Sequence, residues 1–320
     1  MKNDMMNEKE TASCSEMENL CSVAEKPTKK PKKLFAVIAS IVILCVAFLI
    51  VWITVIIPEN NYKTTYDAAT ELYSAGKYDE AIAAFEVLNK QKDCKDMLEK
   101  CYIGKYGEEK YPYILKIKNA KIGDYIEFGN YEQDDISANG HEPIEWIVLE
   151  KEDRAILVIS RFILFPARYH DNYYDKDTAW GNCSLHYQLD YFSNSAFNKT
   201  ERKMILRRTV AASENPLYSV PAGKDKDCKL FLLSVEEALK YFPSNQARIC
   251  LDTPFTHRHF VTHDCPCNVW WLRTRGGGDP LTFSYSNEVC VLEDGSIDFK
   301  GHTFTSQRGI RPAMWLGFED

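Results

Sequence analysis

Twenty-four consecutive residues near the N-terminal end, beginning at Leu34 and ending at Ile57, contain no charged side chain. A helix rises about 1.5 Å per residue, so this run would span roughly 36 Å and cross a hydrocarbon core of about 30 Å. A helix in a soluble core is seldom apolar on every face over such a length. We therefore predict a membrane-spanning helix over residues 34–57.

The flanks of this run predict its orientation. A cleaved signal peptide has an apolar core of about 7–15 residues and small residues at its cleavage site, whereas this run is longer and ends in Ile56-Ile57-Pro58-Glu59. Five lysines lie within residues 26–33, directly before the run. Because lysine and arginine stay on the cytoplasmic side, we expect residues 1–33 to be a disordered cytoplasmic tail. All that follows the run is expected outside the cytoplasm.

Charge and cysteine content narrow the possibilities further. The formal net charge is −7, and no basic stripe occurs outside the lysines next to the apolar run, which argues against nucleic acid as a partner. Of eleven cysteines, eight follow the run: Cys94, Cys101, Cys183, Cys228, Cys250, Cys265, Cys267 and Cys290. An even number in an exported region permits disulfides, and buried free thiols are the alternative.

Residues 58–110 have helical periodicity. Ala68, Leu72 and Ala75 recur on one helix face, Gly76 predicts a break, and Asp79 is a candidate cap for a second helix. The string from Ala69 to Phe85, A-x-x-L-Y-x-x-G-K-Y-D-E-A-I-x-x-F, resembles a tetratricopeptide helical hairpin. This segment is either a spacer or a peptide-binding groove, and we favour the spacer.

The remainder, residues 114–320, has the pattern of an α+β domain. Alternating apolar residues predict a strand over 122–128, and the apolar runs 144–149 and 155–160 predict a hairpin joined through residues 151–154. Helices are expected over 184–192, 199–206 and 234–241, the last with Ser234 and Glu237 at capping-box spacing. Strands return over 269–273, 287–292, 296–299 and 309–316. N- and C-terminal strands are expected side by side.

Several motifs of this domain resemble the bacterial family known as domain of unknown function 6273. The quoted residues are Gly123-Asp124-x-Ile126-x-Phe128-Gly129, Glu142-Pro143-Ile144-Glu145-Trp146, Trp180 with Cys183 and Leu185, Phe231-Leu232-Leu233-Ser234, Trp270-Trp271-Leu272-Arg273 and Arg311-Pro312-Ala313. This resemblance extends from about Ile122 to Leu316 and implies no particular activity.

The order of elements is also similar to the C-type-lectin-like and sulfatase-modifying-factor folds. Trp271-Leu272-Arg273, the glycine loop 276–278 and Gly309-Ile310-Arg311 correspond to the closing strands and loop of that group. The sequence lacks the Glu-Pro-Asn and Trp-Asn-Asp motifs of a calcium lectin. Glu145 is expected to face outward or to form an internal ion pair with Arg273 or Arg311.

A short segment before the Trp-Trp strand is rich in metal-ligand residue types. His257, His259, His263, Cys265 and Cys267 lie within eleven residues, and imidazole and thiolate suit zinc or copper. Cys-x-Cys is tighter than the usual spacing of closed zinc sites, so a polar loop before a strand is the alternative reading. Zinc and copper are therefore the cofactors that this segment could bind.

Aromatic residues provide the candidate ligand site. They cluster with acidic and amide residues between the first strands and the helices, and the candidates are Tyr169, His170, Tyr173, Tyr174 and Trp180, with Arg273 on the later strand. Stacking faces beside hydrogen-bonding groups suit a saccharide or peptide. Ordinary packing of the loop is the alternative.

These observations predict a single-pass membrane protein whose outer domain recognises a glycan, peptide or protein ligand. The alternatives are a metal- or thiol-dependent enzyme on a sulfatase-modifying-factor-like fold and a structural component of the envelope. No serine-hydrolase elbow, phosphate loop or His-Glu-x-x-His motif occurs.

Overall fold

A computed structural model describes residues 57–88, 92–175, 177–260, 267–278 and 287–318. The predicted membrane span at 34–57 and the tail at 1–33 lie outside these ranges, apart from Ile57. Within them, no helix is both long enough and apolar enough to cross a membrane. The chain divides into two units after Asp67, and residues 68–320 form the larger one.

The predicted helical segment is helical in the structure. Its helices are α2 (Ile57–Ser74), α3 (Tyr78–Val87), α4 (Lys92–Tyr106) and α5 (Tyr111–Asn119). Gly76, with φ of +74°, makes the turn between the first two, as its position predicted. Asp79 lies in the first turn of α3 but does not cap it, because the N-cap position is Lys77. Helix α3 packs on α4 and buries Ala81 and Phe85.

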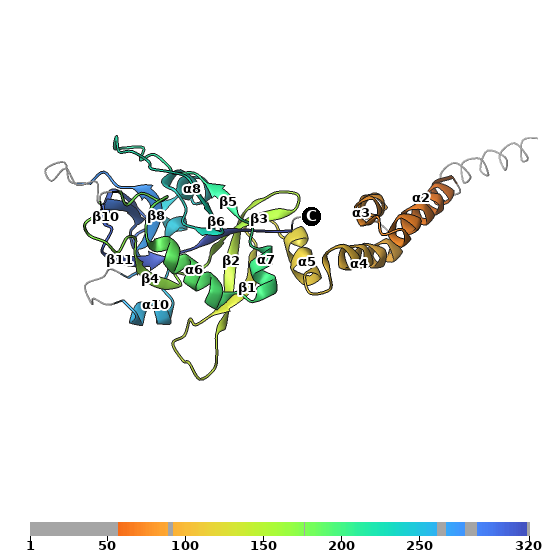
Figure 1. Cartoon of the computed structure of the whole chain (residues 1–320), viewed down its shortest axis with the longest axis horizontal. Coiled ribbons are helices and arrows are strands. Elements are labelled where there is room, and N and C mark those ends of the chain that lie inside the picture. The colour runs from red at the N-terminus through yellow and green to blue at the C-terminus, as the bar shows by residue number, and fades with distance from the viewer. Residues whose placement is uncertain (1–56, 89–91, 176, 261–266, 279–286, 319–320) are drawn as a thin grey trace, which may run out of the picture. The chain divides into compact units, whose positions relative to one another are not determined.

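The first sheet contains five antiparallel strands in the order β1-β2-β3-β12-β7. Its first three strands are labelled in Figure 1. The bounds of the five strands are β1 (Tyr125–Tyr131), β2 (Glu142–Lys151), β3 (Ala155–Ser160), β12 (Ala313–Gly317) and β7 (Leu230–Phe231). Strand β12 lies beside β3, with Met314 opposite Val158. The expected pairing of early and late strands is therefore confirmed.

A second five-stranded sheet has the order β10-β9-β8-β11-β4. Its strands are β10 (Ile297–Thr303), β9 (Asn287–Val291), β8 (Trp270–Arg275), β11 (Gln307–Ile310) and β4 (Phe165–Arg168), and β11 runs parallel to β8. The single closing strand expected over 309–316 is instead two strands in different sheets. The chain changes sheet at Arg311-Pro312, where proline has no N–H to donate to a ladder.

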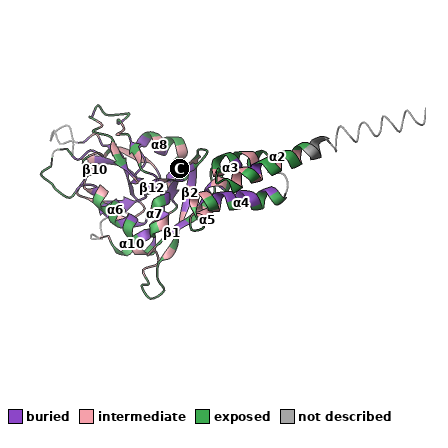
Figure 2. Ribbon diagram, turned by 45° about the vertical axis from the view of Figure 1, so that its right-hand side comes forward, coloured by how far each residue is buried: buried purple, intermediate pink, exposed green. Residues whose placement is uncertain are grey.

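Short helices and a small ribbon surround the sheets. The helices are α6 (Leu185–Ala196), α7 (Lys199–Met204), α8 (Val235–Tyr241), α9 (Asn245–Arg248) and α10 (Pro254–Arg258), and β5 (Arg208–Val210) pairs with β6 (Lys226–Cys228). Both capping-box bonds between Ser234 and Glu237 form, as predicted. Burial alternates around the helices (Figure 2); α6 buries Leu189 and Phe192 and exposes Tyr187 and Tyr191.

The core combines large aromatic side chains with buried charge. Trp146, Trp270 and Trp271 have no exposed surface. Seven of the eight cysteines beyond the apolar run are described, and each is a free thiol. Together these elements confirm an α+β domain.

Candidate functional site

Three of the predicted ligand-site residues lie in the interior. Tyr169 and Trp180 are fully buried, and the Tyr169 hydroxyl donates to the Arg273 carbonyl at 3.2 Å. The side chain of His170 is 7% exposed; its Nε2 lies 2.7 Å from Asp175 Oδ2, and its Nδ1 accepts from the Ser184 N–H at 3.0 Å. These bonds stabilise the loop. Ordinary packing of the loop, the alternative to a ligand site, therefore describes these three residues.

The other predicted residues are divided between surface and core. Tyr173 and Tyr174 are strongly exposed, and their rings meet edge to face with centroids 6.0 Å apart. Arg273 is buried, and its guanidinium binds both carboxylate oxygens of Glu237. The structure therefore does not bring the six predicted residues together as one surface.

A polar pocket of about 390 Å³ opens near this loop, between the first half of α6 and the β5–β6 ribbon. Its lining includes Asn182, His186, Tyr187 and Asp190 from the segment around α6. Arg207, Lys226 and Asp227 line the ribbon side. None of these was among the predicted site residues, because the sequence gives no sign that residues 182–190 face residues 207–227.

The pocket offers donors and acceptors together. The Arg207 guanidinium donates to the Asp227 carbonyl at 3.0 Å, and Lys226 Nζ lies 3.4 Å from the Gly181 carbonyl. Neither cation has a carboxylate within 4.0 Å among the described residues, so both keep donors for a ligand. Asp190 adds an exposed carboxylate, and Tyr187, 79% exposed, adds an aromatic face at the rim.

The floor of the pocket is neutral. Burial raises the pKa of the Cys228 thiol to about 12, so this thiol stays protonated. Burial also lowers the pKa of His186, against an opposing contribution from its bond to the Trp180 carbonyl. The charge of the pocket therefore resides in Arg207, Lys226, Asp190 and Asp227 near its mouth.

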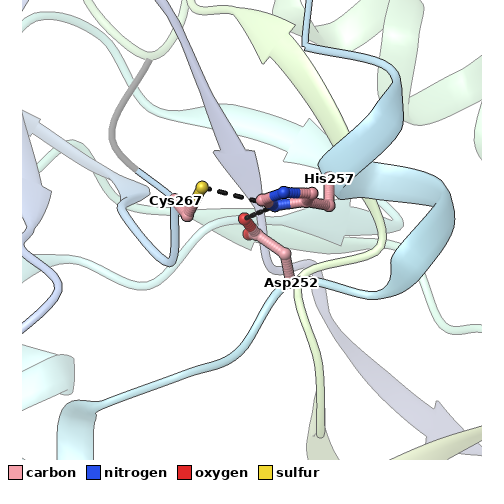
Figure 3. Close-up of side chains that lie close together, drawn as sticks. All are labelled: Asp252, His257 and Cys267. Atoms are coloured by element: carbon pink, nitrogen blue, oxygen red, sulfur yellow. Dashed lines mark hydrogen bonds and ion pairs between the residues drawn. The ribbon is translucent and has the colours of Figure 1, made fainter. Parts of the chain in front are cut away.

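A second candidate site lies before β8, where the structure brings together two of the predicted metal ligands. Cys267 Sγ is 3.3 Å from His257 Nδ1. Asp252 Oδ2 is 4.0 Å from the same nitrogen, and the three ligand atoms all lie within 4.8 Å of one another. Figure 3 shows the sulfur and the carboxylate pointing toward one edge of the imidazole ring.

Hydrogen bonds made by neighbouring residues position these three side chains. Thr253 caps α10 through the Thr256 N–H, and the Ile163 carbonyl accepts from both the Thr253 N–H and the Thr256 hydroxyl. This fixes the helix that bears His257. Asp252 and Asn268 exchange two hydrogen bonds, of 2.9 and 3.0 Å, which tie the segment bearing Asp252 to the turn at Cys267-Asn268.

Of the remaining predicted metal ligands, His259 does not join this group. His259 stacks on Phe255, with ring centroids 4.0 Å apart, and its Nδ1 lies 2.8 Å from the Phe255 carbonyl. His263 and Cys265 lie outside the described residues. Asp252 was not predicted; its position before Thr253-Pro254, a helix start, concealed its proximity to Cys267.

The electrostatics of this cluster disfavour its anionic forms. Burial raises the pKa of Asp252, although the Asn268 N–H and nearby His257 oppose this. Burial, and after it the Asp252 carboxylate, raises the pKa of the Cys267 thiol. Asp252 Oδ1 is buried and has no hydrogen-bond partner within the ranges that the structure describes. A positive charge placed among the three side chains would stabilise the ionised forms of Asp252 and Cys267 and would compensate the burial of the carboxylate.

Comparison with known proteins identifies the domain but no individual relative. No curated protein and no solved structure matches the chain. The family model described as "Domain of unknown function (DUF6273)" matches residues 153–318. That range covers more than half of the chain and includes both the polar pocket and the Asp252–His257–Cys267 cluster, and the chain accordingly belongs to the DUF6273 family.

Proposed function

We propose that this protein is held at a membrane by residues 34–57 and that its DUF6273 domain binds a saccharide outside the cytoplasm, in the pocket between α6 and the β5–β6 ribbon. One observation supports this above others: unpaired cations, a carboxylate and an exposed tyrosine ring line one pocket of about 390 Å³. That volume lies within the usual range for small-ligand sites.

The chemistry of the pocket fits a hydroxyl-rich ligand. Each sugar hydroxyl both donates and accepts, so it is satisfied by a guanidinium or ammonium on one side and a carboxylate on the other. Arg207, Lys226 and Asp190 provide that combination. The exposed face of Tyr187 gives the apolar C–H face of a sugar ring a place to stack. A purely apolar ligand would leave these charged groups desolvated and unpaired.

A peptide or protein ligand is the alternative occupant of an outer domain. Tyr173 and Tyr174 form an exposed aromatic pair, which suits a protein surface better than a sugar. The pocket favours the saccharide because its polar groups converge in a concave site, while the tyrosine pair projects from a loop.

The location and fold are part of the same proposal. The lysine-flanked apolar run supports a cytoplasmic N-terminus, and α2 to α5 support a tetratricopeptide-like spacer between membrane and domain. A C-type-lectin-like fold is supported by the antiparallel pairing of β12 with β3 and by the glycine loop 276–278 after β8. An experimental structure of the chain would test this fold.

Binding can be tested with the full-length chain in detergent on a saccharide array, followed by calorimetry with the strongest saccharide. We expect Tyr187→Ala to weaken binding about tenfold through loss of stacking. Asp190→Ala is expected to weaken binding by a similar factor. Tyr191→Ala is the matched control, since Tyr191 lies one turn along α6, is similarly exposed and does not line the pocket.

Two results would count against the proposal. One is the absence of any bound saccharide on the array. The other is saccharide binding that Tyr187→Ala and Tyr191→Ala reduce equally. Failure on the array with binding of a peptide library, lost on changing Tyr173 and Tyr174, would favour the peptide ligand.

A further inference from the structure

We infer that Asp252, His257 and Cys267 form a divalent metal site of the zinc class, separate from the saccharide pocket. The three side chains present a carboxylate oxygen, an imidazole nitrogen and a sulfur to one point in front of β8 (Figure 3). These are the three ligand types that zinc takes from proteins. The site does not depend on the proposed function.

The distances match a shared ion. With Zn–S of about 2.3 Å and Zn–N and Zn–O of about 2.1 Å, tetrahedral ligands stand roughly 3.4–3.6 Å apart. The observed separations are 3.3 Å from sulfur to nitrogen and 4.0 Å from nitrogen to oxygen. A small rotation of the His257 side chain, which is 62% exposed, would close the difference.

A nucleophilic Cys-His-Asp triad is the competing interpretation, and the geometry argues against it. In such a triad the histidine uses one ring nitrogen for the nucleophile and the other for the orienting carboxylate. Here Cys267 and Asp252 both approach Nδ1 of His257. Convergence on a single nitrogen is the arrangement expected around an ion that three ligands share.

The buried carboxylate of Asp252 is a second and independent argument for a metal ion at this site. The Asp252 side chain is only 3% exposed, and its Oδ1 has no hydrogen-bond partner among the described residues. No lysine or arginine lies within 4.0 Å of Asp252 in the part of the chain that the structure describes. A buried acid without a cation is costly, and a divalent ion bound to Asp252 and the Cys267 thiolate would leave the site neutral.

Two other groups of potential ligands in the described chain lack these properties. Cys290, Asp298 and His302 also lie close together, but the Arg308 guanidinium bonds to the Cys290 thiol and repels positive charge there. Glu132, Asp134 and Glu142 accept backbone N–H groups, including that of Gln133 at 2.7 Å. Both groups are therefore satisfied by the protein.

The ligand set also selects the metal. A soft thiolate, a borderline imidazole and a hard carboxylate together suit borderline ions such as Zn²⁺ and its spectroscopic substitute Co²⁺. Mg²⁺ and Ca²⁺ prefer oxygen ligands alone. Three protein ligands leave a fourth tetrahedral position for water or an external ligand, as in zinc sites that react rather than only stabilise. Binding releases the Cys267 proton, because the thiolate is the ligand.

The experiment is a Co²⁺ and Zn²⁺ titration of the full-length chain in detergent after chelator treatment. We expect one tightly held ion per chain at this site, with a thiolate-to-Co²⁺ absorption band that Zn²⁺ removes. Cys267→Ser should abolish the band, and His257→Asn should weaken binding by about 100-fold or more. Asp252→Asn should also weaken binding.

Matched controls separate this site from other ligands. The control variants are His259→Asn, two residues from His257, and His302→Asn, in the Cys290 group. Both should bind Co²⁺ and Zn²⁺ as the unaltered chain does. Circular dichroism establishes that each variant is folded. The inference is overturned if the unaltered chain retains no Co²⁺ or Zn²⁺ against dialysis, or if His257→Asn and His259→Asn bind metal equally.

Discussion

The guanidinium of Arg273 and the carboxylate of Glu237 form a two-pronged ion pair that joins β8 to the first turn of α8. One bond, from Nη2 to Oε1, measures 2.8 Å, and a second links Nη1 to Oε2. The same carboxylate accepts the Ser234 N–H in the capping box, and the same guanidinium donates to the carbonyls of Leu232 and Ala211. One pair therefore fixes a helix start, a strand and two loops.

We expect Arg273→Met to lower the free energy of unfolding by about 3 kcal/mol, because it leaves a largely buried carboxylate and two carbonyls without their donor. Urea denaturation at neutral pH measures this. The control is Arg161→Met, since Arg161 pairs with Glu145 at 2.6 Å and both side chains are more than a third exposed. That change should cost less than about 1 kcal/mol. Equal losses of unfolding free energy in the two variants would mean that the Arg273–Glu237 pair stabilises the fold no more than the exposed Arg161–Glu145 pair does.

Glu288 should make stability depend on pH. It is fully buried, and burial raises its pKa well above the ordinary value of 4.5, which nearby Arg275 only partly opposes. The unfolded chain then loses this proton at lower pH than the folded chain. Stability contributed by the protonated form is present below about pH 4.5 and falls as pH rises toward the folded pKa.

Glu288→Gln tests this directly, because the neutral amide can still accept from Thr178, which lies 3.0 Å from Glu288 Oε1. The unfolding midpoint of this variant should fall less between pH 5 and pH 8 than that of the unaltered chain. Glu127→Gln, at an exposed position, should leave the pH profile as it was. A Glu288→Gln profile parallel to the original would refute the prediction.

Backbone strain at Gly295 can be separated from steric conflict. Gly295 has φ of +78°, and an added Cβ would lie 1.8 Å from the Asn245 carbonyl oxygen. Gly140 has φ of +87° with open space around it. We expect Gly140→Ala to cost about 1 kcal/mol from conformation alone and Gly295→Ala about 3 kcal/mol. Thermal unfolding of both variants compares them, and similar melting temperatures would contradict a close approach between the β9–β10 turn and α9.

Thiol reactivity should single out Cys267 among the seven described cysteines. Its side chain is partly exposed, whereas the other six are buried. Burial raises the pKa of Cys101 to about 11 and that of Cys290 to about 12. With any bound metal removed by a chelator, iodoacetamide under native conditions should label Cys267 first, and faster at higher pH because the thiolate reacts. Peptide mass spectrometry measures the label; early modification of Cys183 or Cys228 would show that the pocket floor opens.

The elements that the sequence predicted well have strong local signals. Alternating residues indicated β2, a short apolar run indicated β3, and the Ser234–Glu237 spacing indicated the start of α8. Strands β5, β6 and β7 were missed because two or three residues give no period. The break between β11 and β12 was missed because Arg311-Pro312 lies inside one apolar stretch, and only pairing partners distinguish its halves.

The candidate sites were less predictable because they depend on contacts between distant residues. Tyr169 and Trp180 have the polar neighbours of a ligand loop, yet their large apolar surfaces bury against Trp271 and His186. Glu145 was expected to face outward or to meet Arg273 or Arg311; its side chain is 37% exposed and pairs with Arg161, so the outward alternative describes it. Residue type predicted His257 and Cys267 as candidate ligands, but the position of Asp252 beside them depends on contacts with distant residues, the parallel bridge to Ile163 and the two hydrogen bonds to Asn268.

The position of β12 between β3 and β7 has a consequence for how the protein is made. Residues 313–317 are the last described strand, yet they occupy the interior of the first sheet. Until they emerge, β3 has an unpaired apolar edge, which favours aggregation or proteolysis. The sheet therefore closes only after translation has passed residue 317, and a chain that stops before β12 lacks an inner strand and leaves the edge of β3 open.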